Sequence, residues 1–262
     1  MSDYTYEIFQ LAHEDIPLDF VDNLPARFAQ EGTIIHNARN QIKVFSCGAL
    51  QVNVKKFCIP PIVNRILYSI GWRIPKAKKT FMNAEEIIKR GFDTPKPLGY
   101  RIERNYGLID YSYFVSEQIQ NAQPIGHQCT DKELIRALAH YTAELHQAGL
   151  LHKDYTPGNI LYRKTADGKF HFILVDINRF RCRKKPFGKW EVINNLMQPF
   201  HDDELLKFFV LEYAAVRGFG EELYKPVLWM RHLRNTYDAT KRALKKLPGA
   251  YIFLNKPLKK EK

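Results

Sequence analysis

Residues 150–179 read LLHKDYTPGNILYRKTADGKFHFILVDINR, and this stretch decides how the rest of the chain is interpreted. Two apolar runs, ILY and FILV, lie on either side of the turn ADG at 166–168, which is the pattern of a β-hairpin. Asp154 and Asn159 precede the hairpin, and Asp176 stands at the end of its second run. The stretch therefore predicts a polar loop, a hairpin and a carboxylate at a strand end.

These polar residues are the parts that phosphoryl transfer needs. His152, Asp154 and Asn159 have the H-x-D-x-x-x-x-N spacing of a kinase catalytic loop. In that interpretation Asp154 accepts the proton of the acceptor hydroxyl, Asn159 binds a magnesium ion, and Asp176 connects the metal to the phosphates of ATP. The alternative is a surface turn with local Asx-type hydrogen bonds. The complete set in its strand context favours the catalytic loop.

A kinase also needs a strand lysine that contacts the α- and β-phosphates, and an acid that pairs with it. The run VNVK at 52–55 matches the VAIK pattern and makes Lys55 the candidate, while Lys56 points to the opposite face of the strand. The alternative is that Lys55 and Lys56 are both charges exposed to solvent. Helical spacing over 80–90 puts Glu85 beside the inward face and Glu86 nearly opposite, so Glu85 is the predicted partner.

The nucleotide would lie between a strand end and a turn. YFVSEQI at 113–119 reads as a last strand that runs into a connector, so backbone groups of Glu117 to Ile119 are expected to bind adenine. No Gly-rich GxGxxG turn joins the first two strands. The turn there reads HNARNQ, which leaves Arg39, Asn40 or backbone amides to contact phosphate. Arg39 as a solvated turn residue is the alternative.

The order of patterns predicts an α+β chain of two lobes. Three strands are expected within 33–57, a helix over 62–72, and further strands at 91–100 and 111–119. Thr130, with Glu133 three residues later, predicts the start of a helix that ends near Gly149. We expect an N-terminal lobe at about 30–117, a connector at 118–126, a helical C-terminal lobe at 127–250 and a basic tail at 251–262.

Composition limits the class of protein. The chain has 262 residues, a net charge of +12 and 45% hydrophobic residues, enough apolar residues for a packed core. Its four scattered cysteines form no CxxC pair, and no stretch approaches the ~20 apolar residues of a spanning helix. The acidic N-terminus does not resemble a signal peptide. We therefore expect a cytoplasmic protein, either free or peripheral at the inner face of the inner membrane.

Two basic clusters account for much of the positive charge. The run after Asp176 contains Arg179, Arg181, Arg183 and Lys184 and would lie beside an anionic acceptor, with a solubilising run as the alternative. The second cluster surrounds residues 62–79, an apolar helix pattern flanked by Lys and Arg. It fits either a segment that lies on an anionic bilayer or a helix packed on its lobe with the charges in water.

HKDYTPGNIL (152–161) and VDINRFR (175–181) resemble the lipopolysaccharide kinases of the Kdo/WaaP family, in the protein-kinase-like superfamily. The resemblance spans about 30–245 and is nearest to Bacteroidetes-type members. It implies a bilobal kinase fold, Mg-ATP as donor, and a sugar hydroxyl of the lipopolysaccharide inner core, on Kdo or heptose, as acceptor. It also implies family roles for Lys55, Asp154, Asn159 and Asp176.

The chain departs from Ser/Thr protein kinases in ways that leave the acceptor open. Thr156 replaces the lysine two residues after the catalytic Asp, DFG becomes DIN at 176–178, and no APE motif follows. In close relatives the helix glutamate falls at the position of Met82. A RIO-like protein kinase or an aminoglycoside-type kinase is therefore the runner-up. A non-catalytic basic binding protein comes third, and no nucleic-acid partner is expected because the chain lacks the known motifs.

Overall fold

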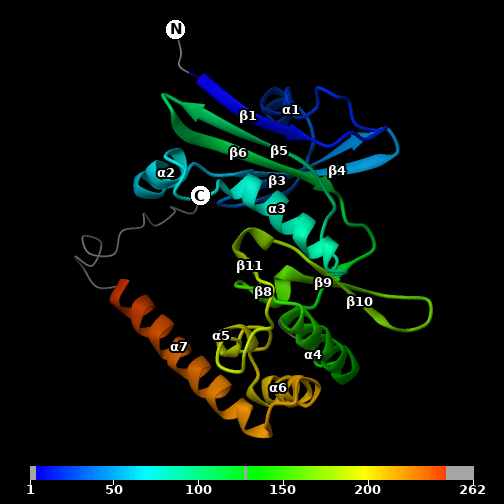
Figure 1. The fold of residues 1–262 in the computed structure, drawn as a ribbon, viewed down its shortest axis with the longest axis vertical. Coiled ribbons are helices and arrows are strands. Elements are labelled where there is room, and N and C mark those ends of the chain that lie inside the picture. Colours follow the sequence, from blue (N-terminus) through cyan, green and yellow to red (C-terminus); the bar gives the residue numbers. More distant parts are fainter. Residues whose placement is uncertain (1–3, 127–128, 246–262) are drawn as a thin grey trace.

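The computed structural model describes residues 4–126 and 129–245, and the predicted tail at 251–262 lies outside them. An antiparallel sheet with its helices forms one lobe and a group of helices forms the other (Figure 1). None of the helices in the described part of the chain is long and apolar enough to cross a bilayer.

A six-stranded antiparallel sheet forms the N-terminal lobe. Its spatial order is β1 (Tyr4–Gln10), β5 (Pro97–Asn105), β6 (Leu108–Glu117), β4 (Leu50–Phe57), β3 (Gln41–Cys47) and β2 (Thr33–Asn37). The three strands expected within 33–57 are present. Strand β1 pairs with β5 in the same sheet, so the boundary placed near residue 30 is too late for this lobe. The signal was the apolar–polar alternation of YTYEIFQ at 4–10.

Alternation along β4 sends its side chains to two separate cores. Val52 and Val54 pack with helix α1 (Leu24–Gln30) on one face. Phe57 packs with Phe81 of helix α3 (Lys76–Lys89) on the other, the face on which Lys55 also lies. Helix α2 (Ile62–Ser69) is different, because none of its residues is buried.

In the described residues of the C-terminal lobe there are four helices and two small sheets. The helices are α4 (Lys132–Gln147), α5 (Ile193–Leu196), α6 (Asp203–Arg217) and α7 (Tyr224–Lys245). The sheets are β10 (Phe170–Leu174), β9 (Ile160–Lys164) and β7 (Gln123–Pro124), and β11 (Phe180–Cys182) with β8 (Leu150–His152). Two one-turn helices flank the hairpin: η1 (Pro157–Asn159) precedes β9, and η2 (Ile177–Arg179) follows β10. A third, η3 (Glu221–Leu223), precedes α7.

The predicted start of α4 was one residue early. Asp131, rather than Thr130, is the N-cap, and its carboxylate accepts hydrogen bonds from the amides of Glu133 and Leu134. Asp and Thr are both good caps, so the sequence pattern alone did not separate the two neighbours.

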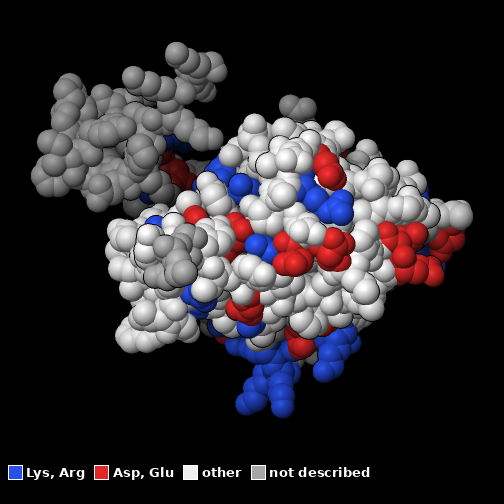
Figure 2. Space-filling model, turned by 90° about the horizontal axis from the view of Figure 1, so that it is seen from above, with Lys and Arg blue, Asp and Glu red and all other residues white. Residues whose placement is uncertain are grey.

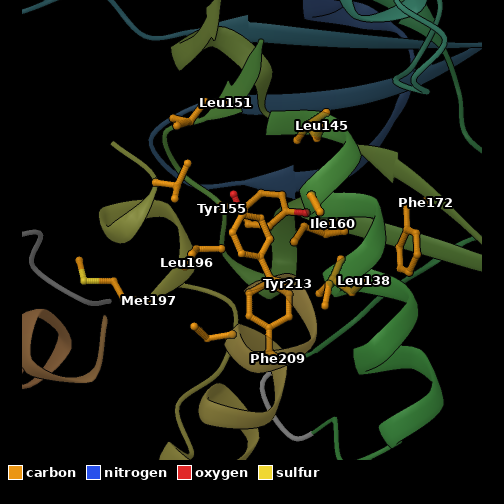
Figure 3. Close-up of a cluster of buried hydrophobic side chains, with 14 of the residues drawn as sticks. Leu138, Leu145, Leu151, Tyr155, Ile160, Phe172, Leu196, Met197, Phe209 and Tyr213 are labelled. Atoms are coloured by element: carbon orange, nitrogen blue, oxygen red, sulfur yellow. The ribbon is translucent and has the colours of Figure 1, made fainter. Parts of the chain in front are cut away.

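The core of the C-terminal lobe holds the catalytic-loop segment from behind. Tyr155, next to Asp154 in the chain, is fully buried among residues that include Leu138 and Tyr213 (Figure 3). Its hydroxyl forms a 2.8 Å hydrogen bond with the hydroxyl of Thr142 on α4. A loop anchored by a buried aromatic ring has little freedom to move, so its polar side chains have defined positions.

Candidate active site

A cavity of about 460 Å³ lies between the lobes, lined from both sides. Strand β4 contributes Lys55, the β6 end and connector contribute Glu117 and Ile119, and the C-terminal lobe contributes Asn159 and Asp176. The structure therefore brings together five residues that were predicted to serve one nucleotide. Their individual roles stay predictions.

Lys55 and Asp176 form the central ion pair of this cavity. Lys55 Nζ lies 2.7 Å from Asp176 Oδ1, and the side chains are 13% and 34% exposed. Asn178 Nδ2 donates to the same oxygen at 2.8 Å. Asp176 has a φ of 54°, in the left-handed region that residues other than glycine rarely adopt. Such backbone strain is typical of functional sites.

The loop before the hairpin is held by its own hydrogen bonds. Asn159 Nδ2 donates to the backbone carbonyl of Asp154 at 2.9 Å, and the Asp154 amide donates to His152 Nδ1 at 3.1 Å. His152 Nε2 donates to the carbonyl of Val175 at 2.9 Å. Because Val175 precedes Asp176, the histidine ties the loop to the strand end. Its ring donates through Nε2 and accepts through Nδ1, so it is neutral. Burial lowers the pKa of His152, which favours the neutral form of the ring.

A buried polar network continues behind His152 into the helices. Asn195 Nδ2 of α5 donates to the His152 carbonyl at 2.5 Å. Asn195 Oδ1 accepts from His146 Nε2 of α4 at 2.9 Å, and Tyr213 of α6 bonds His146 Nδ1 at 3.0 Å. Burial lowers the pKa of His146 to about 3. Sequence reasoning missed this network, because its members lie on three separate helices and form no local motif.

The donor set fits a magnesium ion. Asn159 uses its Nδ2 and Asp176 uses its Oδ1 in the bonds above, whereas Asn159 Oδ1 and Asp176 Oδ2 accept no hydrogen bond from a described residue. Both are hard oxygens on the wall of the same cavity. Mg2+ commonly takes one or two protein oxygens and completes its coordination with phosphates and water.

Glu85 does not pair with Lys55, which corrects one prediction. Its side chain is exposed on α3, and Lys55 pairs with Asp176 instead. Glu86 bonds Arg90 of the same helix. The inward position belongs to Asn83, which is buried and donates to the Ile177 carbonyl at 2.7 Å. Phe81, Ala84 and Ile87 form the buried face of α3, and a residue one step further along the helix from Ala84 turns toward solvent.

Arg39 is also placed differently from its prediction. It is exposed on the β2–β3 turn and does not line the cavity, whereas its neighbour Asn40 and His36 do. Asn40 is the other side chain at this turn that the sequence left to contact phosphate. Its Oδ1 accepts a hydrogen bond from the Cys58 amide at 3.3 Å, which holds the turn close to the end of β4.

The predicted acceptor residues divide into two kinds. Arg183 bonds both carboxylate oxygens of Glu191 and the carbonyl of Pro186, so its charge is used within its own loop. Glu191 lies just beyond the basic run and was not considered with it. Arg179, Arg181 and Lys184 are exposed and form no ion pair with a described carboxylate. Only these three remain available for an acceptor.

Comparison with known proteins agrees with this architecture. The model of the lipopolysaccharide kinase (Kdo/WaaP) family matches residues 60–203, more than half of the chain. The structure of WaaP in complex with acyl carrier protein is similar to 88% of this chain and 98% of that chain, with a TM-score of 0.60 and 14% identity. That likeness shows the fold, and the predicted α+β bilobal protein-kinase-like fold is confirmed.

A second solved structure is more distant, and the curated proteins contain no match. The Rio2 kinase–ADP/Mg2+–phosphoaspartate complex from Chaetomium thermophilum covers 91% of this chain and 81% of that chain, at 15% identity and a TM-score of 0.46. The family match covers both the catalytic loop and the DIN segment, and family members are phosphotransferases. The chain belongs to the lipopolysaccharide kinase (Kdo/WaaP) family and is a kinase.

Proposed function

We propose that this kinase transfers the γ-phosphoryl group of ATP to a sugar hydroxyl of the lipopolysaccharide inner core, on Kdo or on heptose. One observation carries the proposal: Lys55, Asn159 and Asp176 line one cavity, and Asp154 is bonded to Asn159 through its backbone. These are the residue types and the spacing that phosphoryl transfer to an alcohol requires.

Lys55 would hold the α- and β-phosphates of ATP. Its ammonium group is half of an ion pair with Asp176 at the cavity wall, so it is already oriented toward the nucleotide. The adenine would lie against the connector, where Glu117 and Ile119 line the cavity. Glu117 is itself oriented by an ion pair with Lys96, at 3.1 Å.

Asn159 and Asp176 would hold magnesium through their two unused oxygens. The metal, when bound, neutralises the charge of the β- and γ-phosphates and orients them. The structural observation behind this proposal is that each residue keeps one oxygen to which no described residue donates, while the other polar atom of its side chain is hydrogen-bonded. They are thus fixed in position and still able to coordinate.

Asp154 would act as the general base. The acceptor oxygen forms a bond to the γ-phosphorus while the bond from that phosphorus to the bridging oxygen breaks, which releases ADP. The hydroxyl proton passes to the Asp154 carboxylate. The position of this carboxylate is set from behind, because the Asp154 amide and carbonyl are both hydrogen-bonded.

The acceptor class is supported by charge. Arg179, Arg181 and Lys184 follow Asp176 and are exposed without carboxylate partners among the described residues, which suits an anionic glycolipid. An aminoglycoside kinase would need acidic residues for a cationic drug. Because the core sugars are carried on a lipid, we also place the enzyme at the inner face of the inner membrane.

Transfer to defined acceptors tests the proposal. The purified protein is incubated with Mg-ATP and Kdo-lipid A, or with a heptose-containing core, and the gain of one phosphate is followed by mass spectrometry. Transfer by the wild type that is lost in Asp154→Asn is the expected result. Asp167→Asn, an exposed aspartate in the hairpin turn, is the matched control. Labelling of protein or aminoglycoside without labelling of any core acceptor would favour the runner-up.

A further inference from the structure

A second cavity, of about 420 Å³, lies next to the candidate active site. It is bounded by the α2–α3 connection, the first turn of α3, and η2. Its lining includes four cations and two aromatic residues: Arg73, Lys76, Lys79, Arg179, Tyr68 and Trp72. No Asp or Glu lines it. We call it the basic cavity.

Within the described part of the chain, no ion pair balances the four cations of the basic cavity. None forms an ion pair with a carboxylate of the described residues; Arg73 bonds the neutral amide oxygen of Asn64. Burial lowers the pKa of Lys76, and the positive charges of Arg39 and Arg179 lower it further. Lys78, which lies between Lys76 and Lys79 in sequence, instead pairs with Glu7 at 2.7 Å. The cavity therefore has an excess of positive charge that an anionic ligand would relieve.

The basic cavity and the candidate active site share two structural elements. Asn178 and Arg179 of η2 line the basic cavity, and Asp176, which precedes them, lines the active site. On α3, Lys79 lines the basic cavity and the next residue, Thr80, lines the active site. A ligand in the basic cavity thus lies beside the end of the active site that contains the metal ligands, away from the connector.

We propose that the basic cavity binds the anionic group, a carboxylate or a phosphate, of the acidic sugar that accepts the phosphoryl group. The inference rests on the proposed function and adds Arg73, Lys76 and Lys79 to the acceptor site. Two or more cations can share one such anion, and Tyr68 and Trp72 offer flat faces for a sugar ring. The lysines that were grouped with the α2 segment in sequence thereby acquire a role in acceptor recognition.

Direct binding tests this site without any need for transfer. Trp190 and Trp229 are replaced by Phe, so that Trp72, which is 79% exposed at the cavity, reports binding by fluorescence. The probes are free Kdo, inorganic phosphate and neutral galactose. Saturable binding of Kdo, of phosphate or of both, with none of galactose, is expected. Binding of Kdo without binding of phosphate identifies a carboxylate site, and binding of phosphate without binding of Kdo identifies a phosphate site. Binding of neither anion overturns the proposal.

A matched pair of lysines gives the variant test. Lys79→Gln should weaken binding of the anion by about tenfold, as expected for one charge-assisted hydrogen bond, while Lys78→Gln leaves it unchanged. With a Kdo-lipid A acceptor, Lys79→Gln should raise KM for the acceptor and leave KM for ATP unchanged. Equal affinity in the two variants overturns the site. Anion binding without any transfer by the wild type would contradict the proposed function and leave the site standing.

A second surface, the outer face of α2, carries a second proposal. Ile62, Val63, Ile66 and Ile70 follow helical spacing and are 61%, 67%, 43% and 58% exposed. The opposite side of the helix is fixed to the sheet, because Arg65 Nε donates to the Ile109 carbonyl at 2.6 Å and Ser69 Oγ accepts from the Ile109 amide at 2.8 Å. The helix is thus held in place with its apolar side chains directed outward.

We propose that this apolar face docks on an anionic lipid bilayer. The choice of partner rests on charge complementarity: the face continues through Trp72 into Arg73 and the other unpaired cations of the basic cavity. Apolar residues that enter the lipid boundary beside cations that meet acidic headgroups are typical of interfacial helices. Seen from above, the middle of the surface mixes Lys and Arg with Asp and Glu, and Lys and Arg side chains project at its lower edge (Figure 2).

Vesicle sedimentation tests the docking surface. The protein should bind vesicles of phosphatidylcholine mixed with phosphatidylglycerol more tightly than vesicles of phosphatidylcholine alone. Ile62→Gln with Ile66→Gln should lower the partition coefficient by about tenfold or more, since both changes remove an apolar side chain from the lipid boundary. Leu18→Gln, at an exposed leucine outside α2, should have no effect. Absence of binding to anionic vesicles overturns the proposal, as does a dimer in light scattering that the double variant abolishes.

Discussion

The buried polar network of His146, His152 and Asn195 lies close to the wall of the basic cavity, since His152 pairs with Phe180, the residue after Arg179. The two regions use their polar groups in opposite ways. His146, His152 and Asn195 are at most 2% exposed, and each is bonded to another of the three or to the chain around them. The four cations of the basic cavity have no carboxylate partner among the described residues. Groups that bond each other hold a structure in place, whereas unpaired charges are available for a ligand.

The difference predicts where mutations will act. A change in the buried network should lower the free energy of unfolding and loosen the position of Asp154, whose amide is bonded to His152. A change in the basic cavity should alter recognition of the acceptor and leave the fold intact.

Asp154→Asn should have the largest effect. It removes the proton acceptor and keeps the size of the side chain, so kcat should fall by about a thousandfold. Thermal unfolding should be nearly unchanged, because the hydrogen bonds at this position are made by the backbone of Asp154. A variant that retains more than about a tenth of wild-type kcat would remove Asp154 from its proposed role.

Asn195→Ala should lower the free energy of unfolding by about 3 kcal/mol. It deprives the His146 ring nitrogen and the His152 carbonyl of their buried partners, and each unsatisfied group costs about 1–3 kcal/mol. Urea denaturation measures the change. Asn194→Ala, at the exposed neighbouring asparagine, should stay within about 0.5 kcal/mol of wild type. Equal stability of the two variants would mean that the network does not hold the loop.

Lys55→Gln should lower kcat/KM for ATP by about thirtyfold, through loss of a charge-assisted bond to the phosphates. Lys56→Gln is the control on the same strand. The Lys56 ammonium lies 3.8 Å from the centre of the Tyr111 ring on the opposite face of the sheet, away from the cavity. Kinetics with varied ATP measure both. A similar loss in the two variants would indicate a general effect on the strand.

Stability should fall on acidification below pH 6.5. The pKa of His146 is 6.5 in the unfolded chain and about 3 in the fold, so the unfolded state binds a proton that the folded state excludes. His146 contributes its full stabilisation above pH 6.5 and loses about 1.4 kcal/mol for each pH unit below it. The lowered pKa of His152 acts in the same direction. Urea denaturation at several pH values should show a shallower slope in His146→Gln.

Local sequence was a good guide to the site where a motif is contiguous. HKDYTPGN and VDIN predicted that Asp154, Asn159 and Asp176 act as one set; Asn159 and Asp176 line one cavity and Asp154 is bonded to Asn159 through its backbone, while their roles stay predictions. Alternation along β4 likewise separated Lys55 from Lys56. The role of Asn83 could not be predicted, because its amide bonds the carbonyl of Ile177, which lies far away in the sequence.

Three further differences come from contacts that lie outside the sequence windows considered, one within a loop and two between distant segments. Glu191 binds Arg183, Glu7 binds Lys78, and β1 adds a strand to the sheet at β5. A count of charges within a window cannot tell which cations are neutralised. Only the folded chain shows that Lys78 is paired while Lys76 and Lys79 face a cavity without a carboxylate.

The sequence by itself determined the residue types, the spacing of the catalytic loop and the faces of the strands, because these follow from covalent order and from backbone periods. The tertiary structure decided which helix residue turns inward, which cations remain unpaired, and which buried partners hold His152. Those outcomes depend on packing between segments far apart in the chain. Successive positions of a helix differ by about 100° in direction, so a step of one residue moves a side chain from the core to the solvent.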